Sequence, residues 1–199
     1  MRKLAWVFGK SSDFAGNIIN KLKEQDISTY GFGRDNVDYA DFDKFIDGKV
    51  VPDIIVINAN IEEQIALVID NKNYSNITLQ QMSSMFFNYT PLFLFFTKLI
   101  KWLENSSKEI TICGVSSSIT AWPQQDKQFV MYAVLRSMMQ QLVYSASSNV
   151  CNAFCVSPSG IDATNITDYA KRVVELITNR TDLKLIDLTI GKEVVNLQR

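Results

Sequence analysis

Apolar residues gather in short continuous runs that recur along the chain, and longer stretches with a helical spacing of apolar positions separate these runs. The apolar runs span residues 3–8, 27–34, 52–60, 109–115, 150–156 and 183–188. A short apolar run bounded by glycine or polar residues is typical of a buried strand. Continuous runs of this kind predict a parallel sheet that helices cover on both faces.

The stretches between the runs predict helices, because their apolar residues repeat every three to four positions. We expect helices at residues 17–25, 78–103, 126–147 and 168–178, and one or two helical turns within the connector 38–48. Residues 38–48 form a short acidic segment that Gly48 ends, and residues 78–81 have capping-box spacing. Strands and helices therefore alternate, which predicts an α/β fold with a doubly wound parallel sheet in three layers, α/β/α. At 199 residues, we expect a single domain, 1–199.

The long helix expected at 78–103 contains Pro91. Proline has no backbone N–H, so the carbonyl of Phe87 loses its helical donor and we expect a kink at Phe87–Asn88. The kink would place the polar Asn88 beside freed carbonyl groups in an otherwise apolar helix. Two interpretations stay open: a kink that packing accommodates, or a bend that orders a water or a side chain near a site.

Composition and charge argue against two classes of partner. The net charge is −1 and charged residues make up 21% of the chain, whereas a nucleic-acid-binding protein usually carries a basic patch or stripe. The most apolar segment, 91–100, is too short to span a membrane and contains Lys98. The apolar run at the N-terminus is too short for a signal peptide. We therefore expect a cytoplasmic protein that binds neither nucleic acid nor membranes.

The chain has three cysteines, Cys113, Cys151 and Cys155, inside apolar runs, and it has no histidine. An odd number of cysteines without an export signal indicates reduced thiols in a protein core. Histidine is the commonest metal ligand and the commonest general base, so its absence leaves proton transfer to other side chains. We expect no metal site.

The first expected strand, turn and helix form a candidate anion-binding unit. Gly9 ends the strand, and a glycine-bounded turn leads into the helix, which points backbone N–H groups and the helix dipole at a phosphate. A dinucleotide-binding fingerprint has three spaced glycines; here Asp13 occupies the middle position and Ala15 or Gly16 the third. On this local evidence, nucleotide binding and an ordinary strand–helix turn both stay open.

The end of the second expected strand bears on which dinucleotide would bind. Gly33 stands where an acidic residue would bind a ribose 2′-hydroxyl, and Arg34 follows it. The planar fork of an arginine makes two hydrogen bonds to a phosphate, which favours a 2′-phosphate and hence NADP(H). A solvated surface Arg34 is the alternative interpretation, and the nearby Asp35 keeps NAD(H) open.

A cluster of hydroxyl groups and one helix face supply the candidate chemistry. Ser116, Ser117 and Ser118 follow the fourth apolar run, and Tyr132 and Arg136 lie four residues apart in the next expected helix. Residues at i and i+4 share one helix face, so the phenol and the guanidinium can face one pocket. A phenol beside a fixed cation is suited to giving and taking a proton.

The order of these features resembles that of the short-chain dehydrogenase/reductase family over nearly the full chain. The family's helix Asn falls on Asn88 and its strand-end Ser on the cluster 116–118. Its glycine turn is similar to Gly9–Gly16, its Asn-Asn-Ala-Gly to the Ile-Asn-Ala-Asn of 57–60, its Tyr-x-x-x-Lys to 132–136, and its Pro-Gly-x-x-x-Thr loop to 158–164. The resemblance implies a Rossmann fold, a bound NADP(H) with NAD(H) as the alternative, and a small-molecule substrate.

The resemblance also implies roles for individual residues. The implied catalytic set is Asn88, Ser118 with Ser117 as the next choice, Tyr132 as the acid/base, and Arg136 in the place of the family's lysine. The implied cofactor-binding set is Gly9, Ser11, Ser12, Phe14, Arg34, Asp38 near the adenine, Asn58, Ala59, Tyr132, Arg136, Pro158, Gly160, Ile161 and Thr164.

Arg136 is the main departure from the family pattern, because arginine does not lose its proton and its wider fork cannot occupy the position of an ammonium in a proton relay. Three hypotheses follow. The chain is an NADP-dependent oxidoreductase acting on a carbonyl or alcohol of a small substrate, a catalytically weak or inactive dinucleotide-binding sensor or scaffold, or a structural subunit without nucleotide. Under each, we expect a homodimer or homotetramer formed through the helices at 79–103 and 127–147.

Overall fold

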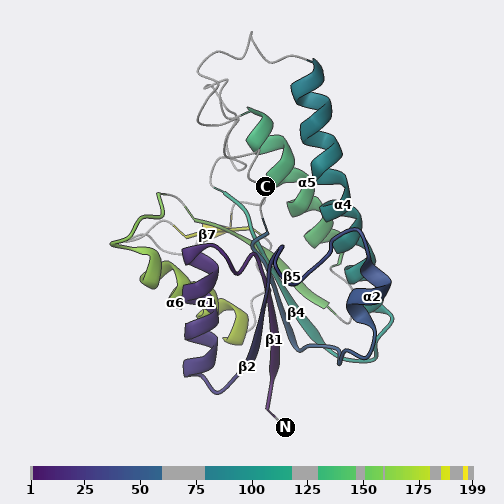
Figure 1. Cartoon of the computed structure of the whole chain (residues 1–199). Coiled ribbons are helices and arrows are strands. Elements are labelled where there is room, and N and C mark those ends of the chain that lie inside the picture. Colours follow the sequence, from purple (N-terminus) through teal and green to yellow (C-terminus); the bar gives the residue numbers. More distant parts are fainter. Residues whose placement is uncertain are drawn as a thin grey trace.

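A seven-stranded sheet forms the centre of the molecule (Figure 1). The structure is a computed structural model, and it describes residues 2–59, 79–117, 130–146, 151–158, 160–179, 185–188 and 195–196. The strands, in the order β2-β1-β3-β4-β5-β6-β7 across the sheet, are β1 (Leu4–Phe8), β2 (Ser28–Phe32), β3 (Ile54–Ile57), β4 (Ile110–Val115), β5 (Cys151–Ser157), β6 (Leu185–Asp187) and β7 (Val195–Asn196). Strands β1 to β6 are parallel, and β7 pairs antiparallel with β6.

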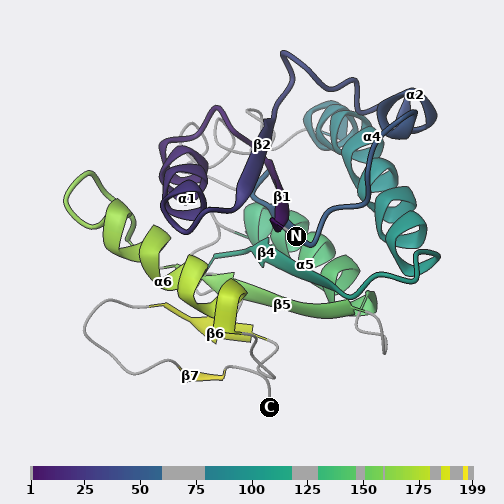
Figure 2. The same ribbon diagram turned by 90° about the horizontal axis from the view of Figure 1, so that it is seen from below.

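Helices cover both faces of the sheet, as the pattern of apolar runs predicts. The helices are α1 (Asp13–Glu24), α2 (Phe42–Ile46), α4 (Leu79–Glu104), α5 (Val130–Ser145) and α6 (Ile166–Asn179). Helices α1 and α6 lie on one face, and α2, α4 and α5 lie on the other (Figures 1 and 2). The predicted doubly wound α/β/α architecture is confirmed.

Alternate residues of each strand divide between two hydrophobic cores. On β1, Trp6 and Phe8 face a core rich in aromatic side chains that α2 and α4 complete, and Phe95 of α4 packs edge-on against Phe8. Ala5 and Val7 face the second core, which α1 and α6 complete. Because both faces of the central strands are buried, their sequences are continuously apolar.

Three sequence-based expectations change in detail. The first helix begins at Asp13, not at Asn17, because Ser12 caps it and Ala15 is already buried against the sheet. Helix α6 begins at Ile166, earlier than expected, and β7 was not expected at all. The three cysteines are free and buried, as expected.

The long helix α4 remains helical through Pro91. The hydroxyl of Thr90, next to the proline, donates a hydrogen bond to the carbonyl of Phe86 (2.7 Å). The expected kink at Phe87–Asn88 stays a prediction.

The strand order reverses between β1 and β3, in the centre of the sheet. After β1 the chain moves outward to β2, and it then returns past β1 to β3, so the connections leave the carboxyl ends of β1 and β3 in opposite directions. Such a reversal of strand order is where open α/β sheets bind their ligands. We therefore expect the predicted site residues to lie at the carboxyl ends of β1 and β3.

Candidate functional site

A cavity of about 780 Å³ opens at the carboxyl ends of the central strands. Its described lining residues are Gly9, Ser11, Ser12, Phe14, Gly33, Arg34, Tyr39, Asn58, Ala59, Asn88, Pro91, Leu92, Val115, Ser116, Ser117, Tyr132, Arg136, Pro158, Gly160 and Ile161. This volume lies within the range of small-molecule and cofactor sites. The cavity brings together nearly all the residues that the sequence singled out.

The turn after β1 forms the floor of the cavity and packs directly on the end of β3. Gly9 has φ +87°, and a Cβ atom there would lie 2.5 Å from the carbonyl oxygen of Asn58. Only glycine fits both this conformation and this approach. The backbone N–H of Gly9 also donates to the carbonyl of Phe32 (2.8 Å), which ties the turn to β2.

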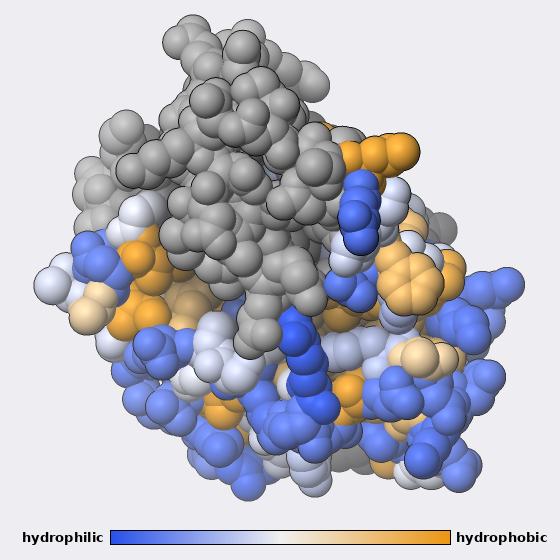
Figure 3. Space-filling view, turned by 45° about the horizontal axis from the view of Figure 1, so that its top comes forward, coloured by the Kyte–Doolittle hydropathy of each residue, from blue (hydrophilic) through white to orange (hydrophobic). Residues whose placement is uncertain are grey.

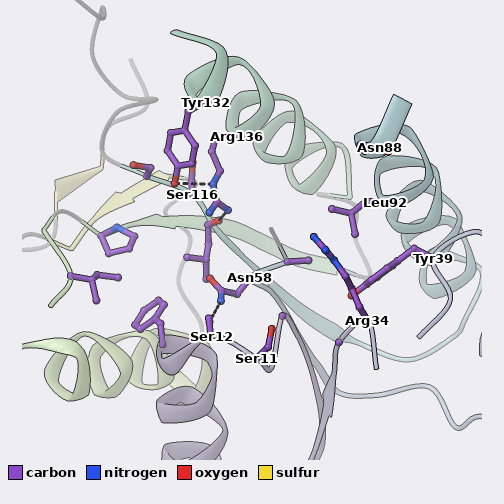
Figure 4. Close-up of a pocket in the computed structure, with 18 of the residues that line it drawn as sticks. Ser11, Ser12, Arg34, Tyr39, Asn58, Asn88, Leu92, Ser116, Tyr132 and Arg136 are labelled. Carbon is purple, nitrogen blue, oxygen red and sulfur yellow. Dashed lines mark hydrogen bonds between the residues drawn. The ribbon is translucent and has the colours of Figure 1, made fainter. Parts of the chain in front are cut away.

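Ser12 joins the start of α1 to β3. Its hydroxyl oxygen accepts hydrogen bonds from the N–H of Ala15 (3.1 Å) and from the side-chain amide of Asn58 (2.7 Å; Figure 4). The N-terminus of α1 therefore has a fixed position at the cavity, where its dipole favours a negative group. Ala15, fully buried, takes the tightly packed third position of the turn, whereas a Cβ at Gly16 would meet open space.

Arg34 and Tyr39 line the end of the cavity next to β2. Figure 4 shows the two side chains close together, near Leu92 of α4 and remote from Tyr132. Burial raises the pKa of Tyr39 to about 12, although the charge of Arg34 partly opposes this shift. Sequence reasoning missed Tyr39 and selected its neighbour Asp38, whose carboxylate accepts from the N–H of Ala40 and does not line the cavity.

Asp35, which could have served a ribose hydroxyl, is engaged elsewhere. Its carboxylate lies 2.6 Å from the ammonium of Lys10, and it is not among the cavity-lining residues. The hydrogen bond from Lys10 lowers the pKa of this carboxyl. The arginine at the end of β2 thus faces the cavity, and the acid beside it does not.

Tyr132 and Arg136 meet on the cavity side of α5, as their spacing predicts. The Nε of Arg136 donates to the phenol oxygen of Tyr132 (3.1 Å), and its Nη1 donates to the carbonyl of Val115 at the end of β4 (3.2 Å). The guanidinium carbon also lies 5.2 Å from the centre of the Tyr132 ring. Arg136 is buried, with 8% of its surface exposed, so these bonds hold it in place.

Two of the three predicted serines, Ser116 and Ser117, line the cavity; Ser118 lies outside the described residues. The hydroxyl of Ser116 donates to Oε1 of Gln140 (3.1 Å). The Nε2 of Gln140 donates in turn to the hydroxyl of Tyr144 (3.0 Å). Sequence reasoning missed Gln140 and Tyr144, although both continue the four-residue spacing of Tyr132 and Arg136 along α5.

Helix α4 contributes Asn88, Pro91 and Leu92 to the opposite wall. The hydroxyl of Tyr89 donates to the carbonyl of Leu135 (2.9 Å), which links α4 to α5 behind the site. Burial raises the pKa of Tyr89 to about 12, and the charge of Arg136 partly opposes this shift. The polar Asn88 therefore has a defined place at the cavity.

The segment after β5 contributes Pro158, Gly160 and Ile161 to the cavity, and their predicted contact with a cofactor stays a prediction. Thr164 does not line it: its N–H and hydroxyl both donate to the carboxylate of Asp162, in the turn that leads into α6. These bonds lower the pKa of Asp162. In the described part of the chain, no group of three or more cysteine, aspartate or glutamate residues is arranged to hold a metal ion.

The fold of the chain matches that of known oxidoreductases. No protein-family model and no curated protein matches it in sequence. A short-chain dehydrogenase/reductase from Serratia marcescens aligns with 95% of this chain and 96% of its own, with a TM-score of 0.70 and 14% identity. A serine dehydrogenase from Escherichia coli (98% and 99%, 0.69, 12% identity) and a 3-oxoacyl-[acyl-carrier protein] reductase from Brucella melitensis (97% and 99%, 0.67, 14% identity) are similar to the same extent.

At these identities the likeness establishes the fold, and the chain has the short-chain dehydrogenase/reductase fold over nearly its full length. None of the helices in the described segments has both the length and the apolarity that a membrane span requires.

Proposed function

We propose that this chain is an NADP(H)-dependent oxidoreductase that reduces a carbonyl group, or oxidises an alcohol, on a small substrate. One observation carries the proposal: the Tyr132–Arg136 pair faces the same cavity as the N-terminus of α1 and Arg34. An anion-binding helix end, a cation suited to phosphate and a proton-carrying phenol are the groups that a dinucleotide-dependent reduction requires.

The residues at the cavity fit a dinucleotide. Gly9 lets the turn approach β3 without a side chain in the way, and the capped start of α1 is suited to the pyrophosphate. Arg34 at one end would hold a 2′-phosphate, while the loop from Pro158 would hold the nicotinamide end beside Tyr132. The cofactor supplies or accepts a hydride at the reacting carbon.

The preference for NADP(H) rests on charge. Among the described residues that line the cavity, two are arginines and none is an aspartate or glutamate. Lys10 pairs with Asp35, the acid next to Arg34, outside the cavity. A cavity of positive charge favours a ligand with more phosphates, because field lines concentrate in a cleft with low-dielectric walls.

Tyr132 would carry the proton. Its oxygen accepts a hydrogen bond from Arg136, so its own O–H can point at a substrate carbonyl oxygen. In reduction, the carbonyl carbon gains the hydride with its electron pair, and the oxygen gains the proton of Tyr132, which solvent then restores. Arg136 stabilises the phenolate that this transfer leaves. Ser117 and Asn88, on the cavity wall, would hold the substrate.

A second candidate is a dinucleotide-binding protein with little or no turnover. Two residues favour it: Arg136 in place of a lysine, and Asp13 in place of the middle glycine at the start of α1. A guanidinium cannot repeat the contacts of an ammonium in a proton relay. Both candidates predict that the protein binds a dinucleotide, and only the first predicts substrate turnover.

Turnover separates these two candidates. Purified protein with NADPH is assayed against a panel of aldehydes, ketones and oxo acids by the loss of NADPH absorbance. The oxidoreductase proposal predicts oxidation of NADPH that depends on one class of substrate. Binding of NADPH without turnover of any substrate, together with turnover in Arg136→Lys, would instead establish the second candidate.

We also propose that the protein is a cytoplasmic homodimer or homotetramer that pairs through α4 and α5. Large hydrophobic side chains of α4 are exposed, namely Leu79, Phe86, Phe87 and Leu94. Figure 3 shows hydrophobic side chains at the surface on the side of the molecule where α4 lies. Light scattering gives the mass directly, and a monomer would contradict this proposal.

A further inference from the structure

Arg136 is a buried cation whose hydrogen-bond partners are neutral. With 8% of its surface exposed, it donates to the phenol of Tyr132 and to the backbone carbonyl of Val115. The face of the Tyr132 ring adds a favourable but uncharged contact at 5.2 Å. These groups satisfy some of its N–H donors, and none of these described partners carries a negative charge.

The described surroundings of Arg136 contain no counter-ion. Within the residues that the structure describes, no carboxylate lies at ion-pair distance from Arg136, whereas Lys10, Lys21 and Lys108 each have one. No described residue lining the cavity is acidic. Buried charges in proteins are usually paired, because removing a charge from water is costly unless an opposite charge offsets it.

The guanidinium has donors left for a ligand. An arginine carries five N–H donors in a rigid fork, and the bonds to Tyr132 and Val115 use two of them. The remaining donors belong to a side chain that lines the cavity, and Figure 4 shows the head group directed into the site between Tyr132 and Asn58. This fork matches the two oxygens of a carboxylate.

We propose that Arg136 binds the carboxylate of the substrate and that the substrate is a short oxo or hydroxy acid. The reacting oxygen must reach Tyr132, and Arg136 touches that same phenol. The carboxylate must therefore lie one or two carbons from the reacting carbon, as in a 2-oxo or 3-oxo acid. This inference rests on the proposed function for the reacting group, but the binding of the carboxylate does not depend on turnover.

The phosphates of the cofactor are a less suitable source of the negative charge. The N-terminus of α1 and Arg34 already provide for them, and both lie away from the Tyr132–Arg136 pair in Figure 4. The two sources predict different results when Arg136 is replaced. Loss of a cofactor contact would lower the affinity for NADPH, whereas loss of a substrate contact would lower the affinity for the oxo or hydroxy acid.

The test measures the binding of oxamate, an unreactive analogue of a 2-oxo acid, and of its uncharged methyl ester by calorimetry. Both are titrated into the free protein and into protein saturated with NADPH. We expect oxamate to bind at least about tenfold more tightly than the ester, a difference of about 1.4 kcal/mol in binding free energy. In Arg136→Gln this preference should disappear, and Arg136→Lys, which keeps the charge without the fork, should retain part of it.

Arg2→Gln is the matched control, because it removes an exposed arginine at the far edge of the sheet and should leave oxamate binding unchanged. Equal binding of oxamate and ester, or a preference that survives in Arg136→Gln, would overturn the inference. So would a loss of NADPH affinity in Arg136→Gln as large as the loss for oxamate. Failure of NADPH to bind would instead count against the proposed function, and the titration of free protein would still decide the role of Arg136.

Discussion

Among single residues, Tyr132 and Arg136 determine what chemistry the cavity can support. The two side chains contact each other in two ways: Arg136 donates to the phenol oxygen, and the phenol ring lies against the guanidinium. Arg136 also bonds to Val115, so the end of β4 fixes the pair as a unit. The consequences for catalysis and for cofactor choice can be tested at separate positions.

Replacing Tyr132 with phenylalanine should lower kcat about 100-fold or more, because it removes the group that donates the proton to the substrate oxygen. The ring remains, so the packing against Arg136 and the affinity for NADPH should change little. Steady-state kinetics and a binding titration measure the two effects. A Tyr132→Phe variant with wild-type kcat would show that another group carries the proton.

Replacing Arg34 with alanine should lower the affinity for NADPH about 10- to 100-fold. A lost hydrogen bond to a charged group costs about 1.5–3 kcal/mol. NADH has no 2′-phosphate, so its affinity should stay the same. Lys10→Ala, which frees Asp35 from its ion pair, should shift the preference toward NADH. If Arg34→Ala weakens NADPH and NADH equally, the assignment of the 2′-phosphate to Arg34 is wrong.

Among the elements, the β1–α1 turn carries the strictest structural requirement. It holds the N-terminus of α1 against the end of β3 through Gly9 and through the bonds of Ser12 to Asn58 and Ala15. The other walls of the cavity come from helices and loops. We therefore expect the turn to matter for stability and, under the proposed function, for nucleotide binding.

Gly9→Ala should destabilise the protein by at least about 1–3 kcal/mol from its positive φ alone. The clash of the new Cβ with Asn58 at 2.5 Å adds to this cost. Gly16→Ala is the matched control: it lies in α1 with open space around it, and it should stabilise the protein by about 0.5–1 kcal/mol. Urea denaturation measures both, and similar values for the two variants would contradict this description of the turn.

In the whole molecule, one sheet separates two hydrophobic cores. Buried phenols near the cavity make the stability of the fold depend on pH in the alkaline range. Burial raises the pKa of Tyr39 and of Tyr89 to about 12 in the folded state, against about 10 in an unfolded chain. A raised folded-state pKa gives stability that is fully present below pH 10 and is lost as pH rises toward 12.

The free energy of unfolding should therefore fall between about pH 10 and 12. In the double variant Tyr39→Phe/Tyr89→Phe this fall should be smaller, because neither phenol remains to ionise. The variant also loses the bond from Tyr89 to Leu135, which lowers its stability at neutral pH, so the two proteins are compared by the slope of stability against pH and not by its absolute value. An unchanged slope in the double variant would show that these phenols do not control alkaline unfolding.

The sequence was sufficient to predict the architecture, because buried parallel strands leave continuous apolar runs and their alternation with helices has few solutions. It also brought Tyr132 and Arg136 together, since helical spacing is a local property. The start of α1 was placed too late because the capping by Ser12 was overlooked. The strand β7, with two residues, leaves too short a pattern to be recognised.

Positions in the loops were the least predictable part of the site. Asp38 and Thr164 matched motif positions, yet local hydrogen bonds turn both into loop-forming residues outside the cavity. Tyr39 lines the cavity through the path of the loop after β2, which no periodicity records. Among the described residues, no acidic side chain lies near Arg136. This property depends on the whole tertiary arrangement, and residue spacing alone cannot reveal it.

The most direct test of the account is a calorimetric titration of the purified protein with NADPH and, separately, with NADH. The cavity between Arg34 and Arg136 predicts one site per chain, with NADPH bound at least about tenfold more tightly than NADH, a difference of about 1.4 kcal/mol. Failure of both dinucleotides to bind would contradict the account.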